Sequence, residues 1–383
     1  MKIAVIGGLG HIGLPLSCIL QVNDSNVIII DENKGIIDSV LSGKPPFFEP
    51  NLKENLDIAL KKGLQITDDY MKISECEYVV VTIGTSSSKK DRLNFMNLID
   101  KVLENLAPNS KLILRSTIDY GTCSKLLKNK IFQKNNIILG YCPERIAEGK
   151  AFDEMVTLPQ IIGAEPDNFS EFEKFFSIIG TDTINVSFEE AEFVKLFSNV
   201  YRYSEFSLIN EFKNISSKFN LNFDRILEVA TLDYPRLENV PSPGFVGGPC
   251  LPKDTKTFVE NFNQENNIID LFSNTNELFL ENILIEIKNN CPSKKIIFLG
   301  LTFKPESDDL RGSVSYELSK KLKIEGFEVY IVEPNIPDEA IEEITYVYED
   351  IKEVSNYVII GTNHKEFKEY DFKDKEVLKI GNK

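Results

Sequence analysis

The sequence predicts an α/β protein in which two doubly wound α/β lobes are joined by a central all-helical domain with a long helix. Three observations support this arrangement. Apolar runs alternate with amphipathic stretches from residue 1 to about residue 185, a region of helical periodicity follows, and the alternation returns after Pro292. We therefore expect domains at residues 1–187, 188–290 and 291–383.

The first lobe is predicted from six short apolar runs, which are typical of buried parallel strands. They are Lys2–Ile6, Val27–Asp31, Tyr78–Ile83, Lys111–Arg115, Ile137–Leu139 and Ile161–Gly163. A glycine-rich turn, Gly8-Leu9-Gly10-His11-Ile12-Gly13, follows the first run and precedes a helical stretch. In a Rossmann unit such glycines provide a tight turn, a close approach to a pyrophosphate and a helix–strand contact.

The position of Asp31 selects the dinucleotide. This residue ends the second run, 18 residues after Gly13. An acid at this place accepts hydrogen bonds from ribose hydroxyls and repels a 2′-phosphate. The first lobe is therefore expected to be Rossmann-like and to bind NAD rather than NADP, and a glycine-rich turn without a ligand is the alternative.

The rest of the chain gives a helical spacer and a second, Rossmann-like lobe. Apolar residues at helical spacing predict a helix of roughly 25–30 residues from about Glu189, and another amphipathic stretch runs from Ile268 to about Lys288. The strands predicted after Pro292 are Lys295–Leu299, Glu328–Val332 and Tyr357–Ile360, with a helix at Val314–Glu325.

Composition excludes several classes of function. A net charge of −16 makes nucleic acid and anionic membranes poor partners, and no apolar run approaches the ~18 residues of a membrane span. The N-terminus enters a strand directly, so a cytoplasmic protein is expected. Six cysteines without a CxxC pair argue against a zinc site and a disulfide framework. The only histidines are His11, expected in a loop, and His364, expected at the surface, so acid–base chemistry must rest mainly on other groups.

A Pro/Gly-rich segment from Pro241 to Asp254 holds one cysteine, Cys250. Its glycines let the backbone turn sharply and come close to a ligand. Pro252 suits a first helical turn, so Cys250 is expected at a helix N-terminus, where the helix dipole favours a nucleophilic thiolate. Together with the dinucleotide turn, this thiol suggests oxidation through a covalent thio-intermediate. Cys142 has neither a glycine loop nor a helix start and is expected to be structural.

Polar residues also follow the predicted strands of the first lobe, where ligand sites of such sheets lie. Glu144 and Glu148 could position or activate a water molecule, and Ser116-Thr117 could bond water or nicotinamide. The alternatives are a loop with a salt bridge from Glu144 or Glu148 to Arg145, and a turn or helix cap made by Ser116-Thr117.

Lys195 and Asn199 are four residues apart on the predicted long helix and so share a face. They could hold a developing alkoxide and a substrate hydroxyl. Taken alone, the pair is better explained as a solvated helix face. Lys304 and Arg311 follow the first strand of the C-terminal lobe, a usual nucleotide-binding position, with surface charge as the alternative. Arg236 is another candidate phosphate partner.

Taken together, these segments resemble the UDP-glucose/GDP-mannose dehydrogenase family, in order and spacing, through all three regions. The matching segments are Gly8 to Pro15, Ser42 to Pro45 with Glu49-Pro50, Ser116-Thr117 with Gly121-Thr122, Pro143-Glu144-Arg145 to Ala151, Lys195-Leu196 with Asn199, Pro243 to Asp254, and Gly300 to Pro305 with Arg311.

The resemblance implies a four-electron oxidation of the C6 alcohol of a nucleotide-sugar with two NAD⁺. The implied catalytic residues are Cys250, Lys195, Asp254, Asn199, Thr117 and Glu148. The implied cofactor-binding residues are Gly8, Gly10, His11, Ile12, Gly13, Asp31, Thr85, Thr117, Glu148 and Lys253. The implied substrate-binding residues are Glu144, Lys195, Asn199, Arg236, Phe245, Gly247, Lys304 and Arg311.

The resemblance also assigns roles and partners. Lys195 steadies the oxyanion with Asn199 beside it, and Asp254, Thr117 and Glu148 organise water and proton transfers. The resemblance further implies a homodimer that forms through the long helix and supplies Arg236 to the partner's site. The substrate expected from the resemblance is UDP-glucose or a UDP-N-acetylhexosamine, with GDP-mannose as the alternative.

Two other classes of function stay open. One is a two-electron dehydrogenase of the β-hydroxyacid type, which also joins a dinucleotide-binding lobe to helices carrying lysine and asparagine. It explains neither the Cys250 loop nor the C-terminal lobe. The other is an NAD sensor without turnover, in which Cys250 is dispensable.

Overall fold

The computed structural model describes residues 1–85, 88–263, 267–337 and 341–380. The backbone divides into two compact units, Met1–Phe197 and Ser198–Lys383. The division falls inside one long helix. Among the described residues, no helix combines the length and the apolar character needed to cross a membrane.

An eight-stranded sheet forms the centre of the first unit, in the order β3-β2-β1-β4-β5-β6-β7-β8. The strands are β1 (Lys2–Ile6), β2 (Asn26–Ile30), β3 (Gln65–Thr67), β4 (Tyr78–Val81), β5 (Lys111–Leu114), β6 (Ile138–Tyr141), β7 (Gln160–Gly163) and β8 (Thr183–Val186). Neighbouring strands are parallel except β6 and β7, which are antiparallel. The first six positions have the doubly wound order, which confirms the predicted fold class.

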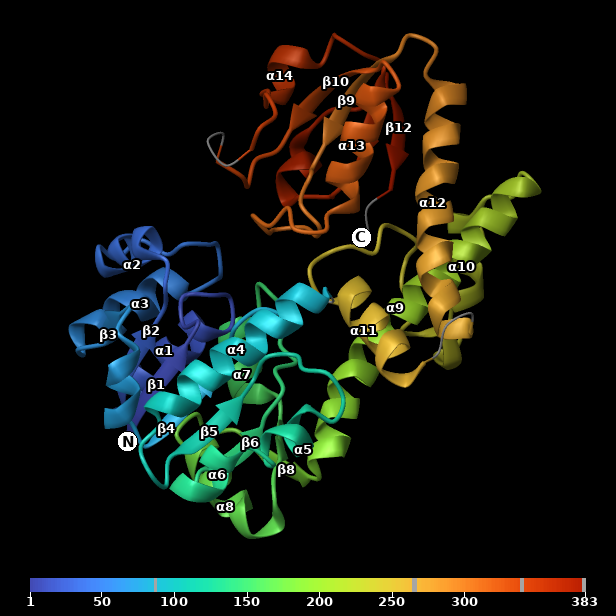
Figure 1. Cartoon of the computed structure of the whole chain (residues 1–383). Helices are drawn as coiled ribbons and strands as arrows, with labels where there is room; N and C mark the ends of the chain where they lie inside the picture. The colour runs from blue at the N-terminus through green and yellow to red at the C-terminus, as the bar shows by residue number, and fades with distance from the viewer. Residues whose placement is uncertain (86–87, 264–266, 338–340, 381–383) are drawn as a thin grey trace. The chain divides into compact units, whose positions relative to one another are not determined.

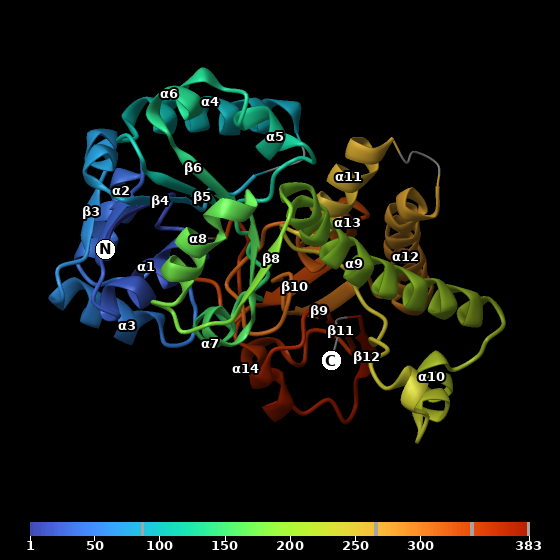
Figure 2. The ribbon, with the colours of Figure 1, turned by 90° about the horizontal axis from the view of Figure 1, so that it is seen from below.

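Helices cover both faces of this sheet (Figures 1 and 2). Figure 2 shows α4 (Lys89–Asn105), α5 (Thr122–Leu126) and α6 (Lys130–Asn135) on one face, with α1 (Gly13–Val22), α3 (Leu52–Lys61) and α8 (Phe169–Phe176) on the other. The unit also contains α2 (Lys34–Leu41), α7 (Ala151–Thr157) and the 3₁₀ helices η1 (Tyr70–Glu75) and η2 (Pro166–Asn168). Because both faces are covered, the central strands are continuous apolar runs.

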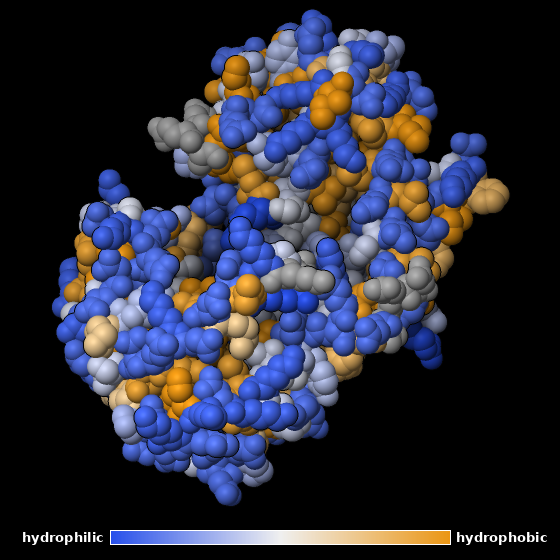
Figure 3. Space-filling model, viewed as in Figure 1, coloured by the Kyte–Doolittle hydropathy of each residue, from blue (hydrophilic) through white to orange (hydrophobic). Residues whose placement is uncertain are grey.

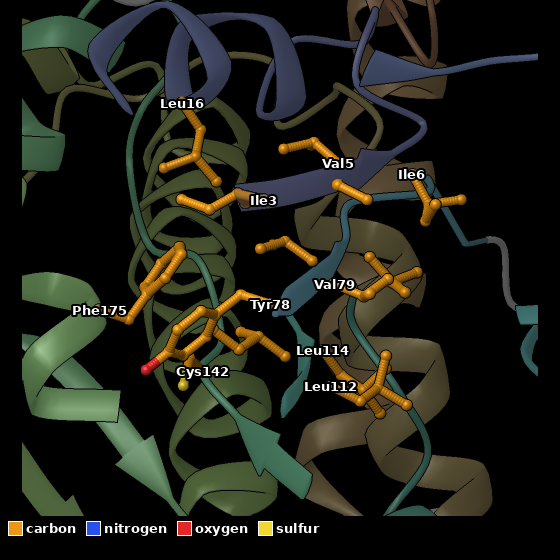
Figure 4. Packing of buried hydrophobic residues seen from close by; sticks show 14 of the residues in the cluster. Ile3, Val5, Ile6, Leu16, Tyr78, Val79, Leu112, Leu114, Cys142 and Phe175 are labelled. Carbon is orange, nitrogen blue, oxygen red and sulfur yellow. The ribbon is translucent and has the colours of Figure 1, made fainter. Parts of the chain in front are cut away.

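The core of the first unit accounts for Cys142. In Figure 4 its sulfur lies beside Tyr78 of β4, within a cluster that also contains Leu16 of α1 and Phe175 of α8. Cys142 is completely buried, and burial raises the pKa of its thiol to about 12. The expectation of a structural cysteine is confirmed.

The region after β8 is helical, as predicted. The long helix α9 runs over Phe188–Lys218, 31 residues and slightly longer than expected. It is followed by α10 (Phe223–Thr231), η3 (Pro235–Leu237), α11 (Leu251–Phe262) and α12 (Ile268–Asn290). The described part of this region contains no strand.

A four-stranded parallel sheet, in the order β10-β9-β11-β12, completes the second unit. Its elements are β9 (Lys295–Leu299), α13 (Val314–Ile324), β10 (Glu328–Val332), α14 (Tyr348–Ile351), β11 (Tyr357–Ile360), η5 (Lys365–Glu369) and β12 (Glu376–Lys379). This order repeats that of β2-β1-β4-β5 in the first sheet. Phe279 and Ile283 of α12 pack in one core with Phe298 of β9, which joins the helices and this sheet into one unit.

Candidate active site

The dinucleotide turn lies between β1 and α1. The Gly7 N–H donates to the Ile30 carbonyl at 2.9 Å, and the Gly10 N–H donates to the Gly7 carbonyl at 3.2 Å. The Leu9 N–H lies 3.4 Å from Oδ2 of Asp31, the residue directly after β2. The Asp31 carboxylate therefore lies at the turn, as the spacing between Gly13 and Asp31 in the sequence predicts.

Gly13 and Gly10 suit the turn for different structural reasons. A Cβ atom at Gly13 would lie 2.6 Å from the Cα of Gly8 and 2.6 Å from Oγ1 of Thr82. At Gly10 a Cβ atom would meet, among the described atoms within 4 Å, only the Gly7 carbonyl oxygen at 3.6 Å. No described side chain caps α1. The open face at Gly10 and the helix N-terminus therefore form a cradle that fits the pyrophosphate of NAD.

Other predicted cofactor residues lie within this turn and in the loop after β4. The His11 ring stacks on Phe47 with ring centroids 3.9 Å apart, and Ile12 packs against the core of the first unit. Oγ1 of Thr85 donates to the carbonyl of Thr117 at 2.8 Å. The loops after β4 and β5 are thereby tied together beside the ends of their strands.

Glu49 holds the loop that carries Glu148. Its buried carboxylate accepts hydrogen bonds from the N–H groups of Gly149 at 2.7 Å and Ala151 at 2.8 Å. Glu148 itself is half-buried. The sequence indicated Glu49 only through the family resemblance, because nothing local shows that its side chain reaches a loop about 100 residues away.

A buried ion pair joins the segments after β5 and β6. Nη2 of Arg115 donates to a carboxylate oxygen of Glu144 and to Oε1 of Gln160, the latter at 3.0 Å. The Arg115 side chain is 1% exposed. Burial lowers the pKa of Arg115 to about 10, which leaves the guanidinium charged at neutral pH. Sequence reasoning missed this pair, because Arg115 was predicted only as the end of a strand.

The Glu144 segment also meets α9. The Glu144 carboxylate pairs with Arg115, whereas the Arg145 side chain donates to the Pro159 carbonyl at 2.5 Å. Nζ of Lys195 donates to the main-chain carbonyl of Glu144 at 2.7 Å. The alternative of a Glu144–Arg145 salt bridge is therefore wrong.

Asn199, one helical turn after Lys195, binds a buried carboxylate of the second unit. Its Nδ2 donates to Oδ2 of Asp254 at 2.5 Å, and Nζ of Lys253 lies 3.1 Å from the other carboxylate oxygen. Asp254 is fully buried, and a buried carboxylate requires such partners. Lys195 is half-buried and Asn199 is buried, so the solvated-face interpretation of this pair is wrong.

Cys250 is the N-cap residue of α11, as predicted. It is exposed, whereas the remaining five cysteines are buried, and all six are free thiols. The buried ones are Cys18, Cys76, Cys123, Cys142 and Cys291. Cys250 is therefore the thiol most accessible to a reactant.

The glycines before Cys250 bring two loops together. Gly248 has φ +88°, and its N–H donates to the Gly312 carbonyl at 2.9 Å. A Cβ atom at Gly248 would lie 2.6 Å from Cδ2 of Phe303, and one at Gly247 would overlap the Gly312 carbonyl oxygen. The glycine pattern is thus explained by contact with the loop after β9.

A small cavity lies next to this contact. It measures about 110 Å³ and is lined by Phe245, Phe303, Lys304, Pro305, Val314, Ser315, Gly361 and Thr362. Nζ of Lys304 lies 5.5 Å from the Phe303 ring centroid. The second unit therefore brings together Phe245 and Lys304, two of the predicted substrate residues.

The two arginines predicted to bind the substrate, Arg311 and Arg236, are not among the residues that line this cavity. Arg311 is paired with Asp309, with Nε 2.9 Å from both carboxylate oxygens and Nη2 2.6 Å from one of them. Arg236, on η3, lies over the Tyr234 ring. It lines a separate cavity of about 680 Å³ bounded by α9 and α10.

His364 is buried, with 0% of its surface exposed, so the expectation of a surface histidine is wrong. Its Nδ1 accepts from the Glu306 N–H at 3.1 Å, and its Nε2 lies 3.1 Å from Oγ1 of Thr302. That hydroxyl donates to the Lys304 carbonyl at 2.8 Å. His364 thus supports the loop that carries Lys304, a role that an isolated histidine in a sequence does not reveal.

Comparison with known proteins gives consecutive matches along the chain. Family models of the UDP-glucose/GDP-mannose dehydrogenase family match residues 1–180 (NAD binding domain), 189–278 (central domain) and 297–380 (UDP binding domain). A UDP-glucose 6-dehydrogenase of Campylobacter jejuni is 31% identical over 359 residues, covering 88% of each chain. A UDP-N-acetyl-D-mannosamine dehydrogenase of Pyrococcus horikoshii is 29% identical over 388 residues, covering 96% of this chain and 90% of the relative.

A solved structure agrees with these relatives. A UDP-D-ManNAc dehydrogenase from Pyrococcus horikoshii superposes with a TM-score of 0.87 at 27% identity, covering 97% of this chain and 91% of that chain. The dinucleotide turn lies in the first matched segment, and the helical region and the second parallel sheet overlap the second and third matched segments. The chain therefore belongs to the UDP-glucose/GDP-mannose dehydrogenase family, and it is an NAD-dependent nucleotide-sugar dehydrogenase.

Proposed function

We propose that this chain oxidises the C6 hydroxyl of a UDP-sugar to the carboxylate of a UDP-uronate, with Cys250 as the nucleophile. The placement of Cys250 carries the proposal: it is exposed at the N-terminus of α11, whereas the remaining thiols are buried. A two-electron dehydrogenase of the β-hydroxyacid type needs no such thiol.

Each region has a part in this proposal. Residues 1–187 bind NAD, residues 188–290 form the helical domain, and residues 291–383 bind the UDP-sugar. The open face at Gly10 supports the first assignment, and the cavity beside Lys304 supports the last.

The reaction has two oxidations and one hydrolysis. When bound, NAD⁺ supplies the oxidant, because each of two successive molecules accepts one hydride from C6 of the sugar. The first oxidation converts the alcohol to an aldehyde, to which the Cys250 sulfur adds as a thiohemiacetal. The second oxidation leaves a thioester, and water then breaks the C–S bond to give the carboxylate and the free thiol.

The surrounding side chains position and stabilise these species. Lys195, held by the Glu144 carbonyl, places an ammonium group to steady the oxyanion. Asn199 lies beside it and binds Asp254, whose carboxylate takes part in proton transfer. Thr117 and Glu148 organise the attacking water.

The substrate is a UDP-sugar in which the C6 carbon is a primary alcohol. UDP-N-acetyl-D-mannosamine and UDP-glucose are the two substrates named for the relatives above. A panel containing these two, UDP-GlcNAc, UDP-GalNAc and GDP-mannose identifies the substrate by the rate of NADH release. Turnover of GDP-mannose alone would contradict the UDP assignment.

The chain acts as a homodimer through α9. Exposed apolar side chains on the part of α9 and α10 in the second unit are Tyr201, Leu208, Phe212, Ile215, Ile226 and Val229. Figure 3 shows apolar residues reaching the surface at the end where α9 leads into α10. Burial of this face in a dimer removes it from water and brings Arg236 toward the partner's site. Sedimentation analysis should give a dimer, and a monomer at micromolar concentration would contradict this assignment.

Replacement of Cys250 tests the proposed chemistry. C250A should abolish uronate formation, whereas C250S should accumulate a covalent sugar adduct visible by mass spectrometry of the intact protein. C76A, which alters a buried thiol, is the matched control and should remain active. Uronate formation by C250A at the native rate would overturn the proposal.

A further inference from the structure

Two asparagines of α9 hold the two ends of the segment that carries Cys250. Asn199 binds Asp254 through the 2.5 Å hydrogen bond described above. Asn210 binds both backbone groups of Gly244: its Nδ2 donates to the Gly244 carbonyl, and the Gly244 N–H donates to its Oδ1, each at 2.9 Å. Cys250 lies between these two anchored positions.

The spacing places both anchors on the same face of α9. Asn199 and Asn210 are eleven residues apart, which is close to three full turns of a helix and about 16 Å along its axis. A single rigid element therefore fixes both Gly244 and Asp254. Most of the chain between them has no helix or strand of its own before α11 begins at Leu251.

The orientation of the Asn210 amide is itself determined by its neighbours. Asn210 is completely buried, and its Nδ2 also donates to Oδ1 of Asn276 on α12 at 3.2 Å. Nδ2 of Asn276 in turn donates to Oγ of Ser207 at 3.1 Å. Both N–H groups of the Asn210 amide and its oxygen are thus used, and a flipped amide would lose its bonds to Gly244.

This pairing restricts the loop. An amide that bonds both the N–H and the carbonyl of one residue acts as a neighbouring strand would. If it is removed, two buried backbone groups of Gly244 lose their partners, which costs more than the bonds themselves contribute. The next fixed point along the loop is the bond from Gly248 to Gly312. Without Asn210, Gly244 loses both of these hydrogen bonds, and the side chain of Phe245, packed against Phe279, is left to hold this part of the loop.

We infer that Asn210 is a positioning residue that holds the Cys250 segment against α9 in its reactive conformation. The inference rests on the proposed role of Cys250 as nucleophile. Asn210 acts through Gly244 and takes no part in the bond changes. A displaced loop lowers kcat because the sulfur no longer stands where the aldehyde carbon is presented, and small displacements of reacting groups reduce rates by as much as about 100-fold.

The test compares three asparagine variants with the unmodified protein. N210A removes both bonds to Gly244, whereas N276A leaves the Asn210 side chain in place and removes the neighbour that orients its amide, together with the bond from Asn276 to Ser207. N214A is the matched control, because Asn214 is a buried asparagine one turn further along α9. For each variant we would measure kcat, the KM for NAD⁺, the Tm, and hydrogen–deuterium exchange over residues 241–250.

Positioning predicts a specific pattern. N210A should lower kcat about 10- to 100-fold, leave the KM for NAD⁺ within about twofold, and raise exchange mainly over residues 241–250. N276A should act in the same direction by a smaller factor, and N214A should leave kcat near the native value. If N210A does not fold, N276A decides: a kcat equal to that of N214A overturns the inference.

The outcome for C250A, measured in parallel, separates the two proposals. Uronate formation by C250A means that the proposed function fails. Loss of activity in C250A together with a native kcat in N210A means that the proposed function stands and the positioning role is wrong. A uniform rise in exchange across the second unit in N210A would also contradict positioning, because it would indicate general destabilisation.

Discussion

Alanine at Gly10 and alanine at Gly13 are expected to affect the protein in different ways. At Gly10 the new methyl group would have ordinary contact with the Gly7 carbonyl oxygen, 3.6 Å away. At Gly13 it would lie 2.6 Å from the Cα of Gly8 and 2.7 Å from the Gly7 carbonyl oxygen. The backbone cannot yield as a flexible side chain can. G13A should therefore disturb folding, whereas G10A should disturb only cofactor binding.

The structure gives rough magnitudes for both variants. Overpacking of this kind costs about 1–3 kcal/mol of unfolding free energy. In a unit of this size each kcal/mol lowers the Tm by about 2–4 °C, so the transition of the first unit should fall by roughly 2–12 °C in G13A. In G10A the methyl group fills the face that a pyrophosphate approaches. We expect the Kd for NAD⁺ to rise by about tenfold or more, which corresponds to roughly 1.4 kcal/mol of binding free energy.

Calorimetry measures both quantities on the same samples. Differential scanning gives the Tm of each variant without cofactor, and isothermal titration gives the Kd for NAD⁺. G10A should keep the native Tm and lose affinity. Native affinity in G10A, or a Tm loss in G10A as large as that in G13A, would refute the distinction between the two glycines.

Three further predictions follow from individual side chains. Iodoacetamide at pH 8 should label only Cys250 in the folded protein, because the other thiols are buried. Burial also raises the pKa of the Cys76 thiol to about 11 and the pKa of the Cys18 and Cys142 thiols to about 12. Labelling of a second thiol in peptide maps would contradict this prediction. D31S should raise the ratio of kcat/KM for NADP⁺ to that for NAD⁺ by about tenfold or more, since the carboxylate that repels a 2′-phosphate is gone; an unchanged ratio would contradict that role. H364A should raise the KM for the UDP-sugar more than the KM for NAD⁺, because the Lys304 loop loses support. It should also lower the unfolding free energy by about 1–3 kcal/mol, because the partly buried Glu306 N–H and the buried Thr302 hydroxyl lose their partner. If the KM for the UDP-sugar and the KM for NAD⁺ in H364A both equal their values in the native protein, this supporting role is excluded.

Much of the fold could be predicted from periodicity. The strands at Lys2–Ile6, Lys295–Leu299 and Glu328–Val332 were predicted at the residues where the structure has them, because buried parallel strands are unbroken apolar runs. The missed strands β3, β8 and β12 are short and contain no buried residue, so their side chains give no apolar run. A local sequence pattern predicts a strand only where burial of that strand requires apolar residues.

The site was predictable only in part, for a related reason. Spacing placed Asp31 at the turn and Cys250 at a helix N-terminus, since both depend on local chain geometry. Arg115, Asn210 and His364 are held by partners distant in sequence. A polar residue in a helix or loop looks the same in sequence whether it faces water or a buried partner.

The stoichiometry of NADH tests the central claim most directly. A limiting amount of the UDP-sugar that is turned over, with excess NAD⁺, is converted to completion, and NADH and uronate are both quantified. The account predicts two NADH for each uronate formed, because an alcohol loses four electrons on the way to a carboxylate. One NADH per sugar, with an aldehyde or ketone as the product, would contradict it.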